Sequence, residues 1–307
     1  MPADRRDRRL IIGLLLILVH ALVFAPSATA SRGDLAKAAI VFARLQGTQD
    51  DYELWTMGPH GGNQHRLTRN RMGDFDPVWS PDGTRIAWVR YPEFGCNCGP
   101  SDVWLMNADG TDRRNLTNDA ADISRPTWSP DGSQIAFTRD YAIWVIDADG
   151  TDEHRISPVG SFDFDPAWSP DGTRIAFVTN GDESFDLFSM RPDGTDRRQL
   201  THTIGISERR PAWSPDGSRI AFSGSHRTSG WHVNLMRADG AGVHVLVDAY
   251  SLDPAWSPDG SRLAFYACVD DCALYRIKPN GARLDPLGLR RGDSDIQPDY
   301  RDVIPTT

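Results

Sequence analysis

The chain has 307 residues, with 33 Lys and Arg against 42 Asp and Glu, so its formal net charge is −9 at pH 7. Nucleic acid and acidic lipid surfaces carry dense negative charge, and an acidic protein of this kind is a poor partner for either. The composition therefore argues against a nucleic-acid-binding function.

The first thirty residues have the pattern of a secretory signal peptide. A basic stretch over 5–9 precedes an apolar run over 10–25, and Ala28-Thr29-Ala30 forms a small-residue cleavage site. The apolar run is short for a membrane span, which needs about 20 residues. We predict a signal peptide over 1–30 and an exported domain over 31–307, periplasmic or extracellular, attached to a membrane only if the signal stays uncleaved.

A seven-residue string, Pro-x-Trp-Ser-Pro-Asp-Gly, recurs along the exported part, and each copy leads into a β-prone run such as Ile86-Ala87-Trp88-Val89. The Trp residues of the copies are Trp79, Trp128, Trp168, Trp213 and Trp256. Successive Trp residues are 40 to 49 positions apart, which is the length of a four-stranded propeller blade. A second repeated turn, typified by Asn107-Ala108-Asp109-Gly110-Thr111, marks the other hairpin of each blade.

Two incomplete units stand at the ends of this repeat. The β-prone run Ile40-Val41-Phe42 has no string before it, and the decayed copy Gln297-Pro298-Asp299-Tyr300 has no run after it. They complete one another if the strand over 297–301 is the innermost strand of the first blade. The prediction is an all-β protein, a six-bladed β-propeller with four-stranded blades and ring closure by the C-terminal strand, which leaves no free sheet edge.

The repeated string Trp-Ser-Pro-Asp-Gly-x-x-Ile-Ala-Phe resembles the PD40, or TolB-type WD40-like, propeller repeat, and the resemblance spans roughly residues 37–301. It implies a propeller in the periplasm or outside the cell that works by binding a protein or a ligand. TolB proteins carry a further α/β domain ahead of the propeller, for which 31–37 offers no room. The resemblance therefore does not by itself imply a role in the Tol system.

Strings that carry catalysis are missing from the sequence. It has no Gly-x-Ser-x-Gly elbow, no His-Glu-x-x-His and no phosphate-binding loop. We therefore predict a binding module with no catalytic residues, cofactor or metal site. The alternative is an enzyme acting on a carbohydrate or lactone at the channel mouth, because propellers can assemble a site from several blades without a linear motif.

One charged or polar residue precedes the first proline of each blade, so six such side chains are predicted to surround the channel mouth. They are Asp76, Arg125, Asp165, Arg210, Asp253 and Gln297. Acidic and basic residues mostly alternate. This pattern suits either a polar site for an ion, water or a charged peptide end, or a belt of ion pairs that sets the spacing of the blades.

The loops between blades and the connections between the second and third strands are predicted to share one face and to vary, whereas the repeated turns share the other face. Aromatic, Arg and His residues in or beside these variable loops are candidate binding anchors. They are Tyr91, Phe94, Arg209, His226, Arg227, Trp231 and Tyr250. We predict that an envelope or secreted protein, or a small ligand, binds this face, with ordinary loop variation as the alternative.

The four cysteines form two close pairs, Cys96 with Cys98 and Cys268 with Cys272. In an exported protein such pairs are candidates for local disulfides. Neither pair has the spacing and His companions of a zinc site. A Cys-x-Cys ring is strained, which leaves the bonding of the first pair open.

Overall fold

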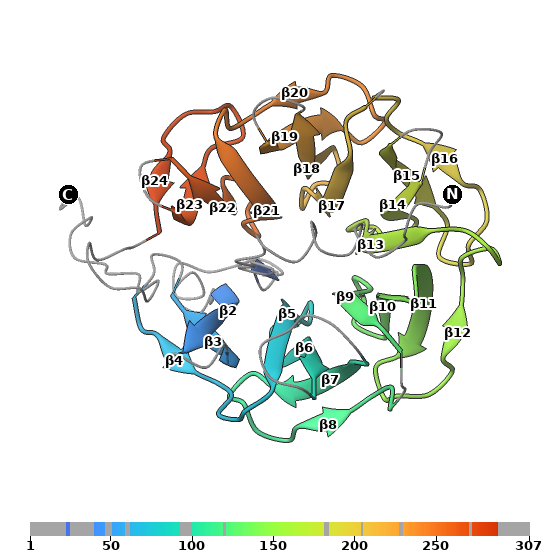
Figure 1. Ribbon diagram of the computed structural model, residues 1–307, viewed down its shortest axis with the longest axis vertical. Coiled ribbons are helices and arrows are strands. Elements are labelled where there is room, and N and C mark those ends of the chain that lie inside the picture. Colours follow the sequence, from blue (N-terminus) through green and yellow to red (C-terminus); the bar gives the residue numbers. More distant parts are fainter. Residues whose placement is uncertain are drawn as a thin grey trace, which may run out of the picture.

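The computed structural model describes residues 23–24, 40–46, 51–58, 62–92, 100–118, 121–180, 184–203, 205–226, 230–269 and 272–287. All regular structure in these ranges is β-strand, arranged as six antiparallel four-stranded sheets around a central axis (Figure 1). The predicted six-bladed propeller with four-stranded blades is confirmed. Within the same ranges, no helix has the length and apolar character that a membrane crossing requires.

Each blade uses four consecutive strands, counted from the channel outward. Blade 1 contains β1 (Val23–Phe24), β2 (Ile40–Gln46), β3 (Asp51–Met57) and β4 (His65–Arg66), and blade 2 contains β5 (Gly73–Trp79), β6 (Arg85–Tyr91), β7 (Asp102–Asn107) and β8 (Arg114–Asn115). Blade 3 contains β9 (Ile123–Trp128), β10 (Gln134–Arg139), β11 (Ala142–Asp147) and β12 (His154–Arg155), and blade 4 contains β13 (Asp163–Trp168), β14 (Ile175–Asn180), β15 (Phe185–Met190) and β16 (Arg198–Gln199). Blade 5 contains β17 (Glu208–Trp213), β18 (Arg219–His226), β19 (Gly230–Arg237) and β20 (His244–Val245), and blade 6 contains β21 (Tyr250–Trp256), β22 (Leu263–Cys268), β23 (Cys272–Ile277) and β24 (Asp285–Pro286).

Blade 1 differs from the expected arrangement at its inner edge. The strand beside β2 is β1, with Val23 opposite Val41 and Phe24 opposite Ile40. This is the place that the sequence assigns to 297–301, which lies outside the described residues, so closure by the C-terminal strand stays a prediction. In the structure β1 occupies this edge of β2, and the backbone groups of a strand edge can pair with any extended segment that reaches them.

The Ser-Pro-Asp-Gly turns and the Trp residues explain why the blades are alike. In blade 4 the Ser169 hydroxyl donates to Asp171 at 2.6 Å, and Gly172 adopts a φ of +71°, which a residue without a Cβ takes at low cost. The Trp directly before the turn links neighbouring blades in three cases, through the indole N–H groups of Trp128, Trp213 and Trp256. The indole N–H of Trp213 donates to the Ala167 carbonyl of the preceding blade at 3.2 Å.

The apolar core is a set of layers between blades. Along β10, Ile135 and Phe137 pack against blade 2, whereas Ala136 packs against Ile175 and Phe177 of blade 4. All five side chains are fully buried. Because neighbouring residues of a strand point to opposite faces, one Ile-Ala-Phe run contributes to two layers.

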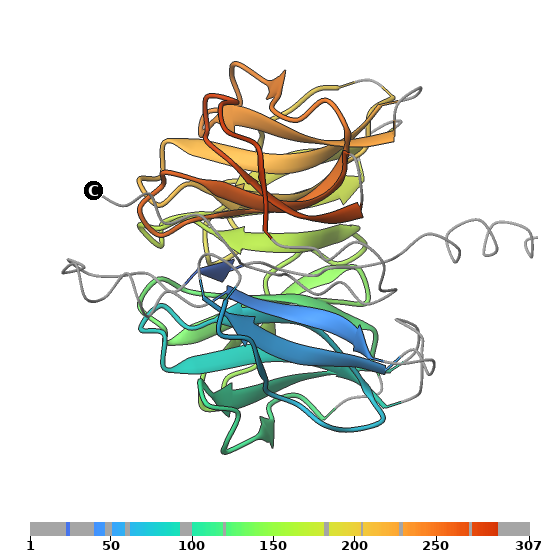
Figure 2. The ribbon, with the colours of Figure 1, turned by 90° about the vertical axis from the view of Figure 1, so that its left-hand side faces the viewer.

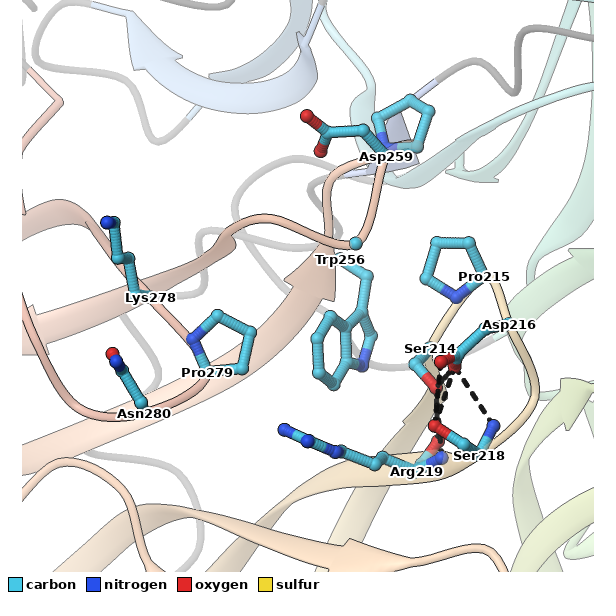
Figure 3. A pocket seen from close by; sticks show the side chains of 12 residues that line it. Ser214, Pro215, Asp216, Ser218, Arg219, Trp256, Asp259, Lys278, Pro279 and Asn280 are labelled. Atoms are coloured by element: carbon cyan, nitrogen blue, oxygen red, sulfur yellow. Dashed lines mark hydrogen bonds between the residues drawn. The ribbon is translucent and has the colours of Figure 1, made fainter. Parts of the chain in front are cut away.

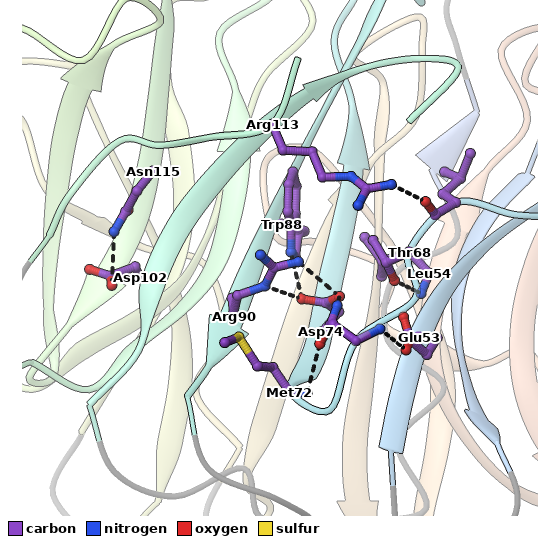
Figure 4. Close-up of polar contacts among 12 residues, drawn as sticks. Glu53, Leu54, Thr68, Met72, Asp74, Trp88, Arg90, Asp102, Arg113 and Asn115 are labelled. Atoms are coloured by element: carbon purple, nitrogen blue, oxygen red, sulfur yellow. Dashed lines mark hydrogen bonds and ion pairs between the residues drawn. The ribbon is translucent and has the colours of Figure 1, made fainter. Parts of the chain in front are cut away.

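A buried polar network joins blades 1 and 2 (Figure 4). The Asp74 carboxylate accepts hydrogen bonds from the Trp88 indole at 2.9 Å and from Arg90 Nε at 2.7 Å. The Asn70 side chain donates to Asp74 at 2.7 Å, while its backbone N–H donates to Glu53 of blade 1 at 2.6 Å. The loop between the two blades is therefore held by a carboxylate from each.

The two ends of the ring carry different kinds of connection. The strands run across the thickness of the ring (Figure 2), so their ends lie at its two faces. The two repeated turns of a blade meet, as where the Ala108 N–H donates to Thr84 O at 2.8 Å and the Ala238 N–H to Ser218 O at 2.9 Å. We call this end the turn face, and we call the end with the inter-blade loops and the second-to-third strand connections the loop face.

Candidate functional site

The predicted channel residues lie together, and each one sits at an irregularity of its strand. The register between the first and second strands shifts beside each of them in blades 2 to 6. Their backbone φ values lie between +49° and +59°, which is uncommon for residues other than glycine: Asp76, Arg125, Asp165, Arg210 and Asp253. A β-bulge of this kind re-aims one side chain of the strand. Gln297, the sixth predicted member, lies outside the described residues.

Arg125 connects carboxylates from three other blades. Its guanidinium lies 3.4 Å from Asp76, 3.7 Å from Asp165 and 3.8 Å from Asp253. Blade 6, which carries Asp253, stands opposite blade 3 in the ring (Figure 1), so this side chain reaches across the channel. Arg210 forms a second ion pair with Asp253, and its backbone N–H donates to Asp165 at 3.1 Å. These buried contacts form the belt of inter-blade ion pairs that was one of the two predicted arrangements.

Burial sets the electrostatics of this belt. Loss of solvent raises the pKa of Asp76 above its ordinary value, although Arg125 opposes the change. Burial also lowers the pKa of Arg210, and Arg125 adds to that effect. For Arg125, burial would lower the pKa, but the neighbouring carboxylates, led by Asp76, raise it above the ordinary value. The described belt holds two guanidinium groups against three carboxyl groups, and burial favours the protonated form of Asp76.

Two of the predicted loop-face anchors, Arg209 and Trp231, lie close together, and a third, Tyr250, lies beside the same strand. Arg209 is exposed, and its guanidinium lies 5.7 Å from the Trp231 ring centre, within the range of a cation–π contact. Trp231 is partly exposed, and a Cβ placed on the adjacent Gly230 would lie 3.2 Å from the Tyr250 ring. The structure thus brings Arg209 and Trp231 together, whereas Tyr250 lies beside Gly230 and packs against the layer between blades 6 and 1.

The other four predicted anchors have different outcomes. Tyr91 is buried, with 2% of its surface exposed, and its hydroxyl donates to the Ile123 carbonyl at 3.2 Å, so its ring is part of the core between blades 2 and 3. Burial raises the pKa of this phenol well above its ordinary value. Phe94, Arg227 and the side chain of His226 lie outside the described residues.

Two aromatic residues that the sequence analysis does not select complete the Arg209 cluster. The Arg209 guanidinium lies 5.5 Å from the Phe164 ring and 5.7 Å from the Phe185 ring, and these rings meet edge to face at 5.1 Å. The string Phe-Asp-Pro over 164–166 places an aromatic residue directly before a channel residue. That string is the signal from which Phe164 was predictable.

A second pair of rings, Tyr141 and Phe162, is exposed on the loop face. Their side chains are 57% and 54% exposed, and the ring centres lie 5.7 Å apart. Asp140 and Tyr141 form a two-residue hairpin turn with φ values of +47° and +59°. Both central residues of such a turn favour Asn or Gly, so an aromatic residue there holds a strained backbone. Tyr141 and Phe162 were not among the predicted anchors, because the prediction was based on the longer loops.

A pair of buried carboxyl groups lies beside the Arg209 cluster. Glu208 accepts hydrogen bonds from the hydroxyls of Thr201 and Thr203 and from the Leu187 N–H at 3.1 Å. Burial nevertheless raises the pKa of Glu208, and the neighbouring Asp186 raises it further. Burial also raises the pKa of Asp186. These groups support the loop between blades 4 and 5, and they hold protons more readily than ordinary carboxyls.

The second cysteine pair is well placed for its predicted bond. Cys268 is the Cα partner of Cys272 across β22 and β23. The side chain of Cys272 and both Cys96 and Cys98 lie outside the described residues, so the two disulfides stay predictions. In the part of the chain that is described, no three His, Cys, Asp or Glu side chains are grouped so as to hold a metal ion.

Comparison with known proteins places this architecture in a family. The model of the TolB beta propeller domain, PD40, matches residues 27–294. TolB from Acinetobacter baumannii aligns with a TM-score of 0.68 at 20% identity, covering 79% of this chain and 61% of that chain, so this chain spans less than two thirds of that protein. No curated protein sequence matches this one.

Enzymes with the same fold also align. An oligogalacturonate lyase in complex with manganese has a TM-score of 0.59 at 15% identity, with coverage of 87% of this chain and 77% of that chain. A puromycin-hydrolyzing peptidase from Mycobacterium tuberculosis has a TM-score of 0.60 at 15% identity, with coverage of 87% and 45%. At such identities the likeness shows the fold alone, because one propeller fold serves many functions.

Proposed function

We propose that this chain, which belongs to the family of the TolB beta propeller domain, is an exported binding module that holds a partner protein on its loop face. The proposal rests on where apolar side chains are exposed. Among the described residues, five of the eight exposed large hydrophobic side chains belong to loop-face connections: Met72, Tyr141, Val159, Phe162 and Val269. Exposed apolar groups gathered on one face are characteristic of protein interaction sites.

The side chains on this face are also held in place before any partner arrives. Tyr141 projects from a two-residue turn and its ring lies tilted against that of Phe162, so little rotamer freedom is left for either to lose on binding. Arg209 is confined by three aromatic rings, and no carboxylate of the described residues pairs with it. The chemistry fits a protein segment that offers apolar side chains next to a carboxylate.

The strained turn provides a test that separates binding from stability. Glycine relieves the positive φ at position 141, so Tyr141→Gly should leave thermal stability unchanged or raise it. The same variant, combined with Phe162→Ser, should weaken binding at least about tenfold, because anchor residues contribute more than about 1 kcal/mol each. The matched control is Val243→Ser with Val245→Ser, which changes two exposed side chains beside the outer strand β20.

The experiment begins by capturing proteins from envelope and culture fractions on the immobilised chain over 31–307. A captured protein is then purified, and its affinity for the parent chain and both variants is measured by calorimetry. The proposal requires that the double variant Tyr141→Gly with Phe162→Ser binds more weakly than the parent, and that the control variant binds as the parent does. Equal affinity for parent and variant, or a loss caused by the control, contradicts it.

The exported location is a part of this proposal with its own test. It predicts that the protein recovered from the periplasm or the medium begins at Ser31. N-terminal sequencing of the recovered protein measures this directly, and a full-length protein in the cytoplasm contradicts it.

The enzyme alternative depends on the channel. The aligned lyase and peptidase show that propellers of this fold occur in enzymes. In this chain Asp76 and Asp165 are engaged with Arg125, which leaves neither carboxylate poised as an independent acid or base. Turnover of a glycan or lactone that is abolished by Asp76→Asn, in a variant that unfolds like the parent, would favour the enzyme.

A further inference from the structure

The repetition of the blades allows the gaps between them to be compared at the turn face. Between blades 2 and 3, the Arg85 guanidinium lies 4.8 Å from the Trp128 ring centre and donates to the Gly132 carbonyl at 3.3 Å. Farther out, Arg114 donates to the carbonyls of Ala148 at 2.8 Å and Asp149 at 3.1 Å. Two arginines from blade 2 therefore reach blade 3 and fill this gap.

The equivalent gap between blades 5 and 6 is not filled in this way. Arg219 and Trp256 stand at the positions of Arg85 and Trp128, but no cation–π contact joins them. His244 replaces Arg114, and its ring instead contacts the Gly242 carbonyl of its own blade at 2.9 Å. The result is an open pocket of about 570 Å³ lined by both blades.

Figure 3 shows the indole of Trp256 between the turn that carries Pro215 and Asp216 and the turn that carries Lys278 to Asn280. Arg219 runs past the indole in this view. Three prolines add apolar surface to the lining: Pro215, Pro258 and Pro279. The pocket thus combines cationic, amide and apolar groups.

The charged groups of the pocket differ in how far they are already engaged. Asp216 accepts from the Ser214 and Ser218 hydroxyls, and these hydrogen bonds, led by that of Ser214, hold its pKa at about 2. Asp259 accepts from Ser261 at 2.8 Å in the same way. In contrast, the side-chain cations of Arg219 and Lys278 have no hydrogen-bond or ion-pair partner among the described residues. Their donors are available to a ligand.

We propose that this pocket, on the face opposite the partner surface, binds a small organic carboxylate whose body is apolar or ring-shaped. Arg219 and Lys278 hold the carboxylate, and the prolines and the edge of Trp256 contact the body. The two Asp side chains offset the two cations, so the pocket favours a singly charged ligand over a phosphate dianion. The guanidinium fork suits the planar carboxylate geometry.

Benzoate is the probe ligand. Benzamide, which has nearly the same shape but no charge, is the control ligand. Ligand-observed NMR and calorimetry on the chain over 31–307 should show benzoate binding at least about tenfold tighter than benzamide and inorganic phosphate, because charge-assisted hydrogen bonds supply the difference. Arg219→Gln and Lys278→Gln should each weaken benzoate about tenfold. Arg85→Gln, the matched change in the filled gap between blades 2 and 3, should leave benzoate binding unchanged.

A fourth variant tests whether the open space of the pocket is needed for binding, separately from its two cations. His244→Arg should reach blade 6 as Arg114 reaches blade 3, and should weaken benzoate although both cations remain. Thermal unfolding establishes that each variant is folded. Failure of benzoate to bind, equal binding of benzamide, tighter binding of phosphate, or no effect of Arg219→Gln and Lys278→Gln would each overturn the proposal.

Discussion

Replacing Arg125 with Met tests whether the ion-pair belt in the channel holds the blades together. The substitution removes a buried cation from within 3.8 Å of carboxylates in three blades, and it leaves Arg210 as the remaining cation of the described belt. Methionine keeps an unbranched stem but lacks the guanidinium, so the change removes the buried positive charge together with its donors. The expected loss arises because the carboxylates stay buried without their partner.

The size of the loss follows from the burial of the partners. Breaking a buried ion pair on one side costs about 3–5 kcal/mol of unfolding free energy. For a chain of this length each kcal/mol lowers the melting temperature by about 2–4 °C, so the variant should melt about 6–20 °C lower. The exposed pair of Arg237 and Asp239 is the control, because Arg237→Gln should produce no measurable change.

The pH dependence provides an independent check on the same variant. Burial raises the folded-state pKa of Asp76 above its unfolded value, so the protonated form is favoured in the folded state. Such a carboxyl contributes stability below its unfolded pKa, and this contribution is lost as pH rises through its folded pKa. Removing Arg125 raises that folded pKa further, so the deficit of the variant should be large at pH 7 and shrink as pH falls.

Denaturant unfolding, followed by Trp fluorescence at several pH values, measures both effects. A deficit below about 1 kcal/mol at pH 7 would show that the belt behaves like a surface ion pair. A deficit that stays constant or grows toward acid pH would refute the assignment of the loss to buried carboxylates. Asp76→Asn combined with Arg125→Met should recover part of the loss, because one buried charge is removed.

Three further predictions concern other parts of the ring. Glu208→Gln should gain stability relative to the parent as pH rises through the raised pKa of Glu208, because only the parent must then bury a charge. A difference in unfolding free energy between variant and parent that is the same at pH 4 and pH 8 would contradict this. Non-reducing peptide mapping should find Cys268 linked to Cys272, since the two face each other across β22 and β23, and alkylation of both before reduction would exclude the bond. Deleting 297–307 from the chain over 31–307 should lower its melting temperature if the strand over 297–301 closes blade 1, and an unchanged melting temperature would argue for closure by another segment.

The predicted fold was correct in its main features because each blade repeats a local pattern. A Pro-x-Trp-Ser-Pro-Asp-Gly string followed by Ile-Ala-Phe specifies a tight hairpin, and the interval between copies specifies four strands. The channel residues were found for the same reason: Asp76 and its equivalents occupy one position of the repeat. Their mutual contacts follow from ring symmetry.

The partner surface could be predicted only in part. Arg209, Trp231 and Tyr250 were selected by residue type, whereas Phe164 and Phe185 join Arg209 only because blades 4 and 5 are adjacent in space. Tyr91 has the same chemistry as a binding anchor, yet its ring is buried, and nothing in its residue type distinguishes the two states. Tyr141 lies in a two-residue turn, whereas the predicted anchors were taken from the longer, more variable loops.

By itself, the sequence determined the number of blades, the strands of blades 2 to 6 and five of the residues that meet in the channel, because these depend on local turn chemistry repeated in register. Only the tertiary structure decided which loop residues are exposed, which rings confine Arg209 and which gap at the turn face stays open. Arg85 and Arg219 illustrate the difference. They occupy the same position of the repeat, but in blade 2 Arg114 also bonds to carbonyls of blade 3, whereas in blade 5 His244 contacts Gly242 of its own blade and the gap is left as a pocket.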